Sequence, residues 1–168
     1  ERELDYIKEA EHLQRLAQQA RKHGFRVKIP NAYKEYSTRK ILVMEFIDAP
    51  TLKSYYSKNI APPESARFFK EGVFFELYSF LFDGFFHADP HPANILVLPE
   101  GRLGLVDAGI ASEVKVEDRK KFARFMKAVV EADEEGSLKA FFGIVRTPFL
   151  EMLAEAKWIY PQHWMRIQ

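Results

Sequence analysis

The sequence contains no cysteine and almost no excess of charge of either sign. The absence of cysteine excludes a disulfide scaffold, a thiolate zinc site and a cysteine nucleophile. Lys and Arg total 25 against 24 Asp and Glu, which leaves a net charge of +1. A protein that coats nucleic acid needs a clustered basic excess, so this balance argues against a nucleic-acid partner.

Long hydrophobic runs, internal repeats and low-complexity stretches are also missing. Charged residues interrupt the most apolar segment, residues 62–82, well before the ~20 apolar residues that span a bilayer, so we expect a buried helix there. The chain begins with Glu1 and shows no basic-then-apolar leader. We therefore expect no targeting peptide in this sequence and interpret it as a piece of a longer protein.

Periodicity and turn residues predict a mainly helical chain with a little β structure, an α+β fold. The first helix is expected without a capping residue, and a polar turn joins two short strands. Helices are expected over residues 3–23, 62–82, 122–130, 137–145 and 149–160, and strands over 32–36, 40–46, 95–98 and 103–106.

Residues 21–40 hold seven basic residues and one acid. A solvated face is the favoured interpretation, and a surface for phosphates or lipid headgroups is the alternative.

The most informative stretch is residues 87–109, HADPHPANILVLPEGRLGLVDAG. Two prolines exclude a helix, so we expect His87, Asp89 and His91 on a rigid loop. Two apolar runs flank the pair Glu100 and Gly101, which predicts a β-hairpin.

A hairpin centred between Glu100 and Gly101 places Asn94 opposite Asp107. Directly opposed residues have Cβ atoms ~5 Å apart, close enough to share one small cation. The loop would bring Asp89 to the same place, and a register shift of one residue would separate Asn94 from Asp107. One amide and one or two carboxylates suit Mg²⁺, which completes its shell with water and substrate phosphates.

This layout is that of a protein kinase: H-x-D, four residues, Asn, and then a metal-binding Asp that begins D-x-G. The segment at residues 87–92 (HADPHP), followed by Asn94, resembles the UbiB/ADCK family of atypical kinases, with Ala93 where that family usually has glycine. Residues 3–10 (ELDYIKEA) resemble its ExD motif and the glutamate of its helix C, and residues 43–48 (VMEFID) resemble its hinge.

The resemblance covers residues 3–109 firmly and implies a protein-kinase-like fold that binds ATP or ADP with Mg²⁺. It also implies support of ubiquinone (coenzyme Q) or related prenyl-lipid biosynthesis at a bacterial inner membrane, a mitochondrion or a plastid. Lipid or quinone precursors and quinone-biosynthesis proteins would be its partners.

The resemblance also assigns roles to single residues. Asp89 is the catalytic-loop aspartate, with His87 beside it, and Asn94 and Asp107 hold Mg²⁺. The remaining assignments are Glu9 as the partner of the nucleotide-binding lysine, main-chain groups of Glu45 and Ile47 as adenine contacts, and Glu3 and Asp5 as the ExD motif.

Residues 1–46 are then a remnant of the small lobe, residues 47–50 the hinge and residues 51–168 the helical lobe. The lysine strand, an alanine-rich loop and the KxGQ segment would lie upstream, so this chain alone is expected to be a poor catalyst. Ala108 stands where D-F-G has phenylalanine, a change that removes a large side chain. Only residues 110–116 separate this motif from the next helix, which leaves no room for a long activation loop and argues against a conventional protein kinase.

Three alternatives stay open. A small-molecule phosphotransferase of the aminoglycoside or choline kinase type also has H-x-D-x-x-x-x-N, and Ala108 is compatible with a non-catalytic scaffold that binds nucleotide. His87, Asp89 and His91 could instead form a transition-metal site, although the oxygen-rich pair of Asn94 and Asp107 argues against it.

Overall fold

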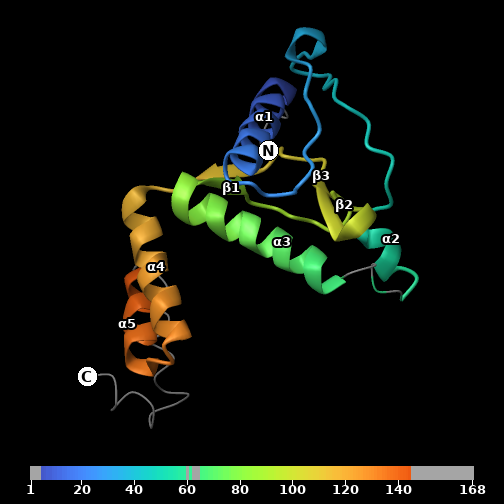
Figure 1. Cartoon of the computed structure of the whole chain (residues 1–168). Coiled ribbons are helices and arrows are strands. Elements are labelled where there is room, and N and C mark those ends of the chain that lie inside the picture. Colours follow the sequence, from blue (N-terminus) through green and yellow to red (C-terminus); the bar gives the residue numbers. More distant parts are fainter. Residues whose placement is uncertain (1–4, 60, 62–64, 145–168) are drawn as a thin grey trace, which may run out of the picture. The chain divides into compact units, whose positions relative to one another are not determined.

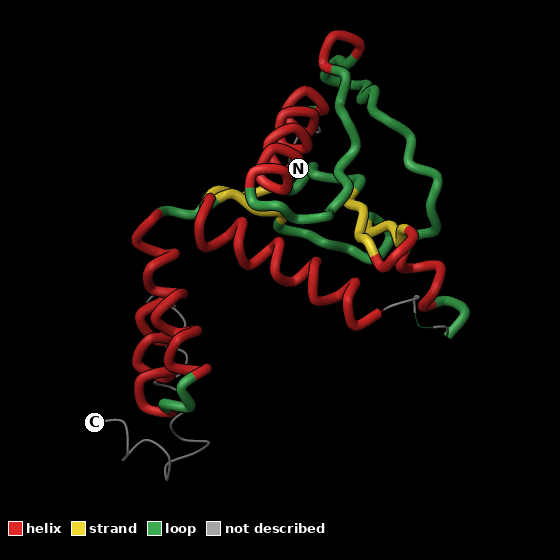
Figure 2. Tube along the Cα trace, viewed as in Figure 1, coloured by secondary structure: helices red, strands yellow, loops and turns green. Residues whose placement is uncertain are grey.

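A computed structural model describes residues 5–59, 61 and 65–144 (Figure 1). The chain divides into two compact units, Glu1–Glu113 and Val114–Gln168. The first unit contains α1 (Tyr6–Lys22), α2 (Leu52–Tyr56), α3 (Ser65–Tyr78), β1 (Phe85–His87), β2 (Ile95–Leu98), β3 (Arg102–Leu105) and β4 (Ala111–Glu113). The second contains α4 (Val116–Val130) and α5 (Glu134–Ile144). Figure 2 shows how short the strands are beside the helices.

The first helix is present, but it has a cap that the sequence analysis did not expect. The Asp5 carboxylate accepts a hydrogen bond of 3.2 Å from the Ile7 amide, so the helix begins at Tyr6. Gly24 follows its last turn with a φ of 73°, a left-handed conformation that favours glycine. Glu3 lies outside the described residues.

The two strands expected between residues 32 and 46 do not form as a ladder. Ala32 and Met44 make an isolated β-bridge. At the next pair the Ser37 hydroxyl is inserted between the strands: it accepts from the Val43 amide at 3.0 Å and donates to the Tyr33 carbonyl at 2.8 Å. Because the Ser37 hydroxyl takes these main-chain groups, the ladder is interrupted there, and a second isolated bridge joins Thr38 to Ile41.

Helix α3 occupies much of the segment predicted as a buried helix, and a π-helical turn (Ser79–Asp83) extends it. Within the described residues only part of it is covered. Phe68 and Phe75 are fully buried, whereas Phe69, Val73 and Phe74 are 41–55% exposed. The expectation of a helix buried on all sides is therefore wrong for the described part of the chain.

The core of the first unit forms where α1, α3 and the β2–β3 hairpin meet. The hairpin packs on α3 and beside α2, and β1 lies between α1 and α3 (Figure 1). The largest buried apolar side chains are Leu13 and Leu16 of α1 and Phe68 and Phe75 of α3. Burial of each contributes on the order of 2 kcal/mol.

The β2–β3 hairpin forms with β2 at the expected residues and β3 one residue earlier than expected, and its register also differs by one residue. Ile95 pairs with Leu105, and the loop has three residues, Pro99–Gly101, instead of two. The loop needs two left-handed residues, Glu100 at a φ of 61° and Gly101 at 63°. The expected pairing of Asn94 with Asp107 across the ladder is therefore wrong.

A second pair of strands, β1 and β4, fixes the position of His87, the first residue of the motif at residues 87–92. His87 lies in β1, opposite Ala111 of β4, and not on a loop as expected. β4 has the sequence Ala-Ser-Glu, which carries no strand pattern, and the sequence analysis did not predict it. Helix α4 begins at Val116, so the interval after Gly109 is as short as expected.

The second unit consists of two packed helices. Phe125 of α4 and Phe141 of α5 lie with ring centroids 5.9 Å apart. Both helices were predicted, whereas the one expected over residues 149–160 lies outside the described residues. In the part of the chain that the structure describes, no helix is both long enough and apolar enough to cross a bilayer.

The basic residues between positions 21 and 40 are mostly neutralised by acids from other segments. Their ion pairs are Lys22–Asp83 (3.2 Å), Arg26–Glu100 (2.8 Å), Lys28–Glu45 (2.6 Å), Lys34–Glu11 (3.2 Å) and Arg39–Asp5 (3.9 Å). This pairing supports the interpretation of a solvated face over that of an anion-binding surface.

Candidate nucleotide and metal site

Asn94 and Asp107 lie in direct contact. The Asn94 side-chain amide donates to Asp107 Oδ2 at 3.0 Å, and the Gly109 amide donates to Asp107 Oδ1 at 2.8 Å. Both residues lie beyond the last ladder pair, where the chain leaves strand geometry and their side chains can turn toward each other. The contact occurs without the register that the sequence analysis relied on, so the expected sensitivity to a one-residue shift is also wrong.

Glu9 of α1 faces the same turn. Its side chain is 9% exposed, and burial raises its pKa, as does the neighbouring Asp107 carboxylate. A hydrogen bond from the Ala108 amide acts in the opposite direction. A Cβ added at Gly109 would lie 3.5 Å from a Glu9 oxygen and 3.3 Å from Asp107 Oδ1, so the turn fits closely between the two acids.

A second side chain of α1 holds this turn from the same helix face. His12 Nδ1 lies 2.9 Å from the Ala108 carbonyl oxygen. The Ala108 side chain, which replaces the phenylalanine of D-F-G, is fully buried in the core. The sequence analysis missed His12, although its spacing of three residues from Glu9 places both on one face of a helix.

His87 is buried and supports the loop that carries Asp89. Its Nδ1 accepts a hydrogen bond of 3.1 Å from the Asp89 amide, which leaves Nε2 to carry the proton of the neutral ring. Burial lowers the pKa of His87, although the Asp107 carbonyl and the charges of Asp107 and Asp89 oppose this shift. A neutral His87 orients Asp89 through the main chain.

The loop after His87 is closed by its own main chain. The His91 amide donates to the Asp89 carbonyl at 2.7 Å, and the Asn94 amide donates to the His91 carbonyl at 2.8 Å. The His91 ring accepts from the Ala93 amide at 3.2 Å, so both imidazoles turn to their own loop. Among residues 5–59, 61 and 65–144, no three His, Cys, Asp or Glu side chains converge on a metal position, and the transition-metal alternative gains no support.

The two expected adenine contacts lie on a segment fixed by Glu45. Its carboxylate binds the Lys28 ammonium group at 2.6 Å and accepts a hydrogen bond from the Asn31 amide at 3.1 Å. The hydrogen bond from Lys28 lowers the pKa of Glu45, and the bond from Asn31 lowers it further. The Glu45 amide donates to the Asn31 carbonyl at 2.8 Å. Among the described residues, none of the hydrogen bonds uses the Glu45 carbonyl or the Ile47 amide.

Asp5, the described half of the expected ExD motif, lies one helical turn before Glu9. The Glu9 amide donates to the Asp5 carbonyl at 3.2 Å, while the Asp5 carboxylate caps the helix. The structure thus brings together Glu9, Asn94 and Asp107, with His87 beside Asp89, and leaves Glu45 and Ile47 on a separate segment.

Comparison with known proteins identifies the family. The ABC1 atypical kinase-like domain matches residues 1–141. The chain belongs to this family. Among its relatives, Arabidopsis thaliana ACTIVITY OF BC1 COMPLEX KINASE 3, chloroplastic, is 29% identical over 84% of this chain and 20% of its own length. ACTIVITY OF BC1 COMPLEX KINASE 8, chloroplastic, of the same plant is 31% identical over 82% of this chain and 18% of its own length.

The resemblance to the UbiB/ADCK family, to which these kinases belong, is confirmed. The fold is confirmed by the structure of Rv3197 from Mycobacterium tuberculosis, solved as a complex with erythromycin. It has a TM-score of 0.58 and 22% identity over 82% of this chain and 34% of that chain. This ABC1-family chain is therefore a partial kinase-like α+β fold, and it spans about a fifth of the length of the plant relatives named above.

Proposed function

We propose that this ABC1-family chain is the catalytic-loop portion of an atypical kinase or ATPase that binds ATP with Mg²⁺. The contact between Asn94 and Asp107, next to the loop that carries Asp89, is the observation that supports this most directly. The proposal retains the division into a small-lobe remnant (residues 1–46), a hinge (47–50) and a helical lobe (51–168).

The donor set at Asn94 and Asp107 fits Mg²⁺. With its Nδ2 directed to Asp107, Asn94 keeps its amide oxygen for a ligand, and Asp107 supplies a carboxylate. Mg²⁺ is usually held by one or two carboxylates together with water and substrate phosphates, so a third acid is not required. When bound, it would supply charge neutralisation at the nucleotide phosphates.

The roles proposed for the remaining residues are those that the family resemblance implies. Asp89 would accept the proton of the attacking hydroxyl or water, and His87 would orient it through the hydrogen bond to its main chain. Glu9 would pair with a lysine that this chain does not contain. The Glu45 carbonyl and the Ile47 amide would bind the adenine edge.

We further propose that the full-length protein supports ubiquinone or related prenyl-lipid biosynthesis at a membrane, with quinone precursors and biosynthetic proteins as partners. This part rests on the family resemblance. Two of the plant relatives are named as chloroplastic, which supports an organelle as one location.

The nucleotide part is tested by binding of a fluorescent ATP analogue to the full-length protein, with and without Mg²⁺. Asp107→Asn should abolish the Mg²⁺-dependent part of the affinity, whereas Asp89→Asn should retain binding and lose turnover. Asp118→Asn, an exposed aspartate on α4, is the control. Undiminished binding by Asp107→Asn would contradict the metal assignment, and unchanged turnover by Asp89→Asn would contradict the catalytic one.

The quinone part has a separate test, complementation of a quinone-deficient strain. Asp89→Asn should fail to restore growth if chemistry is needed. Restored growth would favour a scaffold that acts without catalysis.

A further inference from the structure

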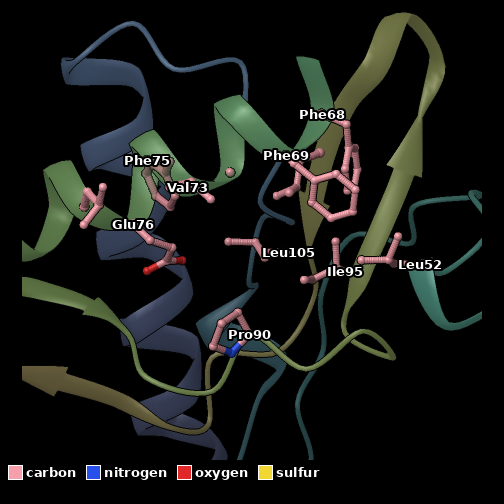
Figure 3. Close-up of a pocket in the computed structure, with 12 residues that line it drawn as sticks. Leu52, Phe68, Phe69, Val73, Phe75, Glu76, Pro90, Ile95 and Leu105 are labelled. Atoms are coloured by element: carbon pink, nitrogen blue, oxygen red, sulfur yellow. The ribbon is translucent and has the colours of Figure 1, made fainter. Parts of the chain in front are cut away.

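An apolar pocket of about 370 Å³ lies between α3, the β2–β3 hairpin and the loop after β1, beside the core of the first unit (Figure 3). Phe68, Phe69 and Val73 of α3 line it from one side, and Pro90 of the catalytic loop lines it from another. Leu52 lies at one end in Figure 3 and Glu76 at the other. The volume is that of a small-molecule site.

Among the described residues that line this pocket, Glu76 is the one with an ionisable side chain. Both of its carboxylate oxygens are buried, and neither makes a hydrogen bond within the described residues. The main-chain amide of His87, on β1, is the group that comes near it. A buried carboxyl whose hydrogen-bonding capacity is not fully used costs free energy, and a ligand that supplies the missing group would recover part of that cost.

Burial raises the pKa of Glu76 to about 7, and the His87 amide only partly opposes this effect. The carboxyl is therefore largely protonated below neutral pH. A protonated carboxyl offers one O–H donor and one carbonyl acceptor. The complement that avoids burying a charge is a neutral oxygen group, a carbonyl or a hydroxyl.

We propose that this pocket binds a small neutral apolar molecule whose single carbonyl or hydroxyl group hydrogen-bonds to the Glu76 carboxyl. The apolar body of the ligand lies against Phe69, Val73 and Pro90. Pro90 follows Asp89 directly, so the bound ligand contacts the loop that carries the proposed catalytic residue.

The probe for this test is 6-propionyl-2-(dimethylamino)naphthalene, an uncharged naphthalene with one carbonyl whose emission shifts to the blue in apolar surroundings. It is titrated into the full-length protein between pH 5.5 and 8.5. We expect saturable blue-shifted binding that is constant at the acid end. Above pH 7 the affinity should fall by up to about tenfold per pH unit, because an ionised Glu76 loses its donor.

Two variants test separately whether probe binding needs the open pocket and whether it needs the Glu76 carboxyl. Val73→Trp places a large side chain on a residue that is 55% exposed, so it should fill the opening without disturbing the core and weaken binding at least about tenfold. Val129→Trp, on an exposed valine of α4, is the matched control and should bind normally. Glu76→Gln keeps a donor and an acceptor, so it should bind with no pH dependence.

Three outcomes would overturn the proposal. They are no saturable blue shift in the wild-type protein, equal affinity in Val73→Trp, and the same pH dependence in Glu76→Gln as in the wild type. The first would mean that another part of the full-length protein fills the pocket. None of these outcomes depends on nucleotide binding.

Discussion

The side-chain amide of Asn94 lies 3.0 Å from a carboxylate oxygen of Asp107, although the two residues are not paired across the hairpin that connects them. The last ladder pair is Ile95 with Leu105, so Asn94 precedes β2 by one residue and Asp107 follows β3 by two. Side chains beyond the last pair of a ladder need not point alternately to the two faces of the sheet. The site therefore depends on how the chain leaves the strands, and on the amide that holds Asp107.

Asn94→Asp tests this relationship. It replaces an amide donor with a third carboxylate beside Asp107 and Glu9, so like charges should lower the free energy of unfolding by about 1–3 kcal/mol in EDTA. If Mg²⁺ binds here, millimolar Mg²⁺ should recover more stability in the variant than in the wild type. Urea unfolding with and without Mg²⁺ measures both effects, and an equal response to Mg²⁺ would contradict the metal assignment.

The hairpin shows what could be predicted from the sequence and what could not. Two apolar runs around Glu100 and Gly101 were enough to predict the strands, because each run is short and a turn separates them. The register depends on whether the loop has two or three residues, and Glu100 takes a left-handed conformation that glutamate rarely adopts. The sequence pattern therefore predicted the two strands, but it predicted a register that differs by one residue from the observed one.

The candidate site was predictable to a similar extent. Asp89, Asn94 and Asp107 stand out because kinase chemistry fixes their spacing. Glu76 did not, because a charged residue within an apolar helix is usually one that reaches solvent. Its burial depends on where the segment after α3 folds back beside the helix, which no periodicity specifies.

Glu9→Gln tests the like-charge contact with Asp107. The folded protein raises the pKa of Glu9 by burial and by the Asp107 charge, so the folded state binds this proton more tightly than the unfolded state does. Stability from this group is present below the unfolded pKa of about 4.5 and is lost as the pH rises through the folded value. In this chain, which does not contain the proposed lysine partner of Glu9, the variant should thus be more stable than the wild type at pH 8, with the gain vanishing near pH 4.

Urea midpoints across this pH range measure the effect of Glu9→Gln. Glu11→Gln, an exposed residue of the same helix that pairs with Lys34, is its control and should show no such gain. If Glu9→Gln shifted the urea midpoint by the same amount at every pH, the effect would come from packing and not from charge.

Gly101→Ala tests the three-residue loop. Gly101 has a φ of 63°, where a Cβ is strained, so the variant should lower the free energy of unfolding by about 1–2 kcal/mol. Gly143→Ala is the opposite control, because a Cβ there meets nothing within 4 Å and α5 has helical geometry. It should stabilise by up to about 1 kcal/mol. Equal effects of the two changes on thermal unfolding would contradict the assigned loop conformation.

Glu76→Gln tests the buried acid through stability, without any ligand. Burial raises the pKa of Glu76 from 4.5 to about 7, so the folded state favours the protonated form. The stability that this group contributes is present below pH 4.5, declines as the pH rises from 4.5 to 7, and is lost above 7. The full difference of about 2.5 pKa units corresponds to about 3 kcal/mol.

Glutamine cannot ionise, so Glu76→Gln should unfold at a higher urea concentration than the wild type at pH 8 and at a similar one at pH 4.5. Glu117→Gln, an exposed residue of α4, should follow the wild type at both pH values. If the wild type and Glu76→Gln lost stability in parallel between pH 5 and 8, Glu76 would be ionised in the folded protein at no cost. Its carboxylate would then have a hydrogen-bond partner within the protein and would need none from a ligand.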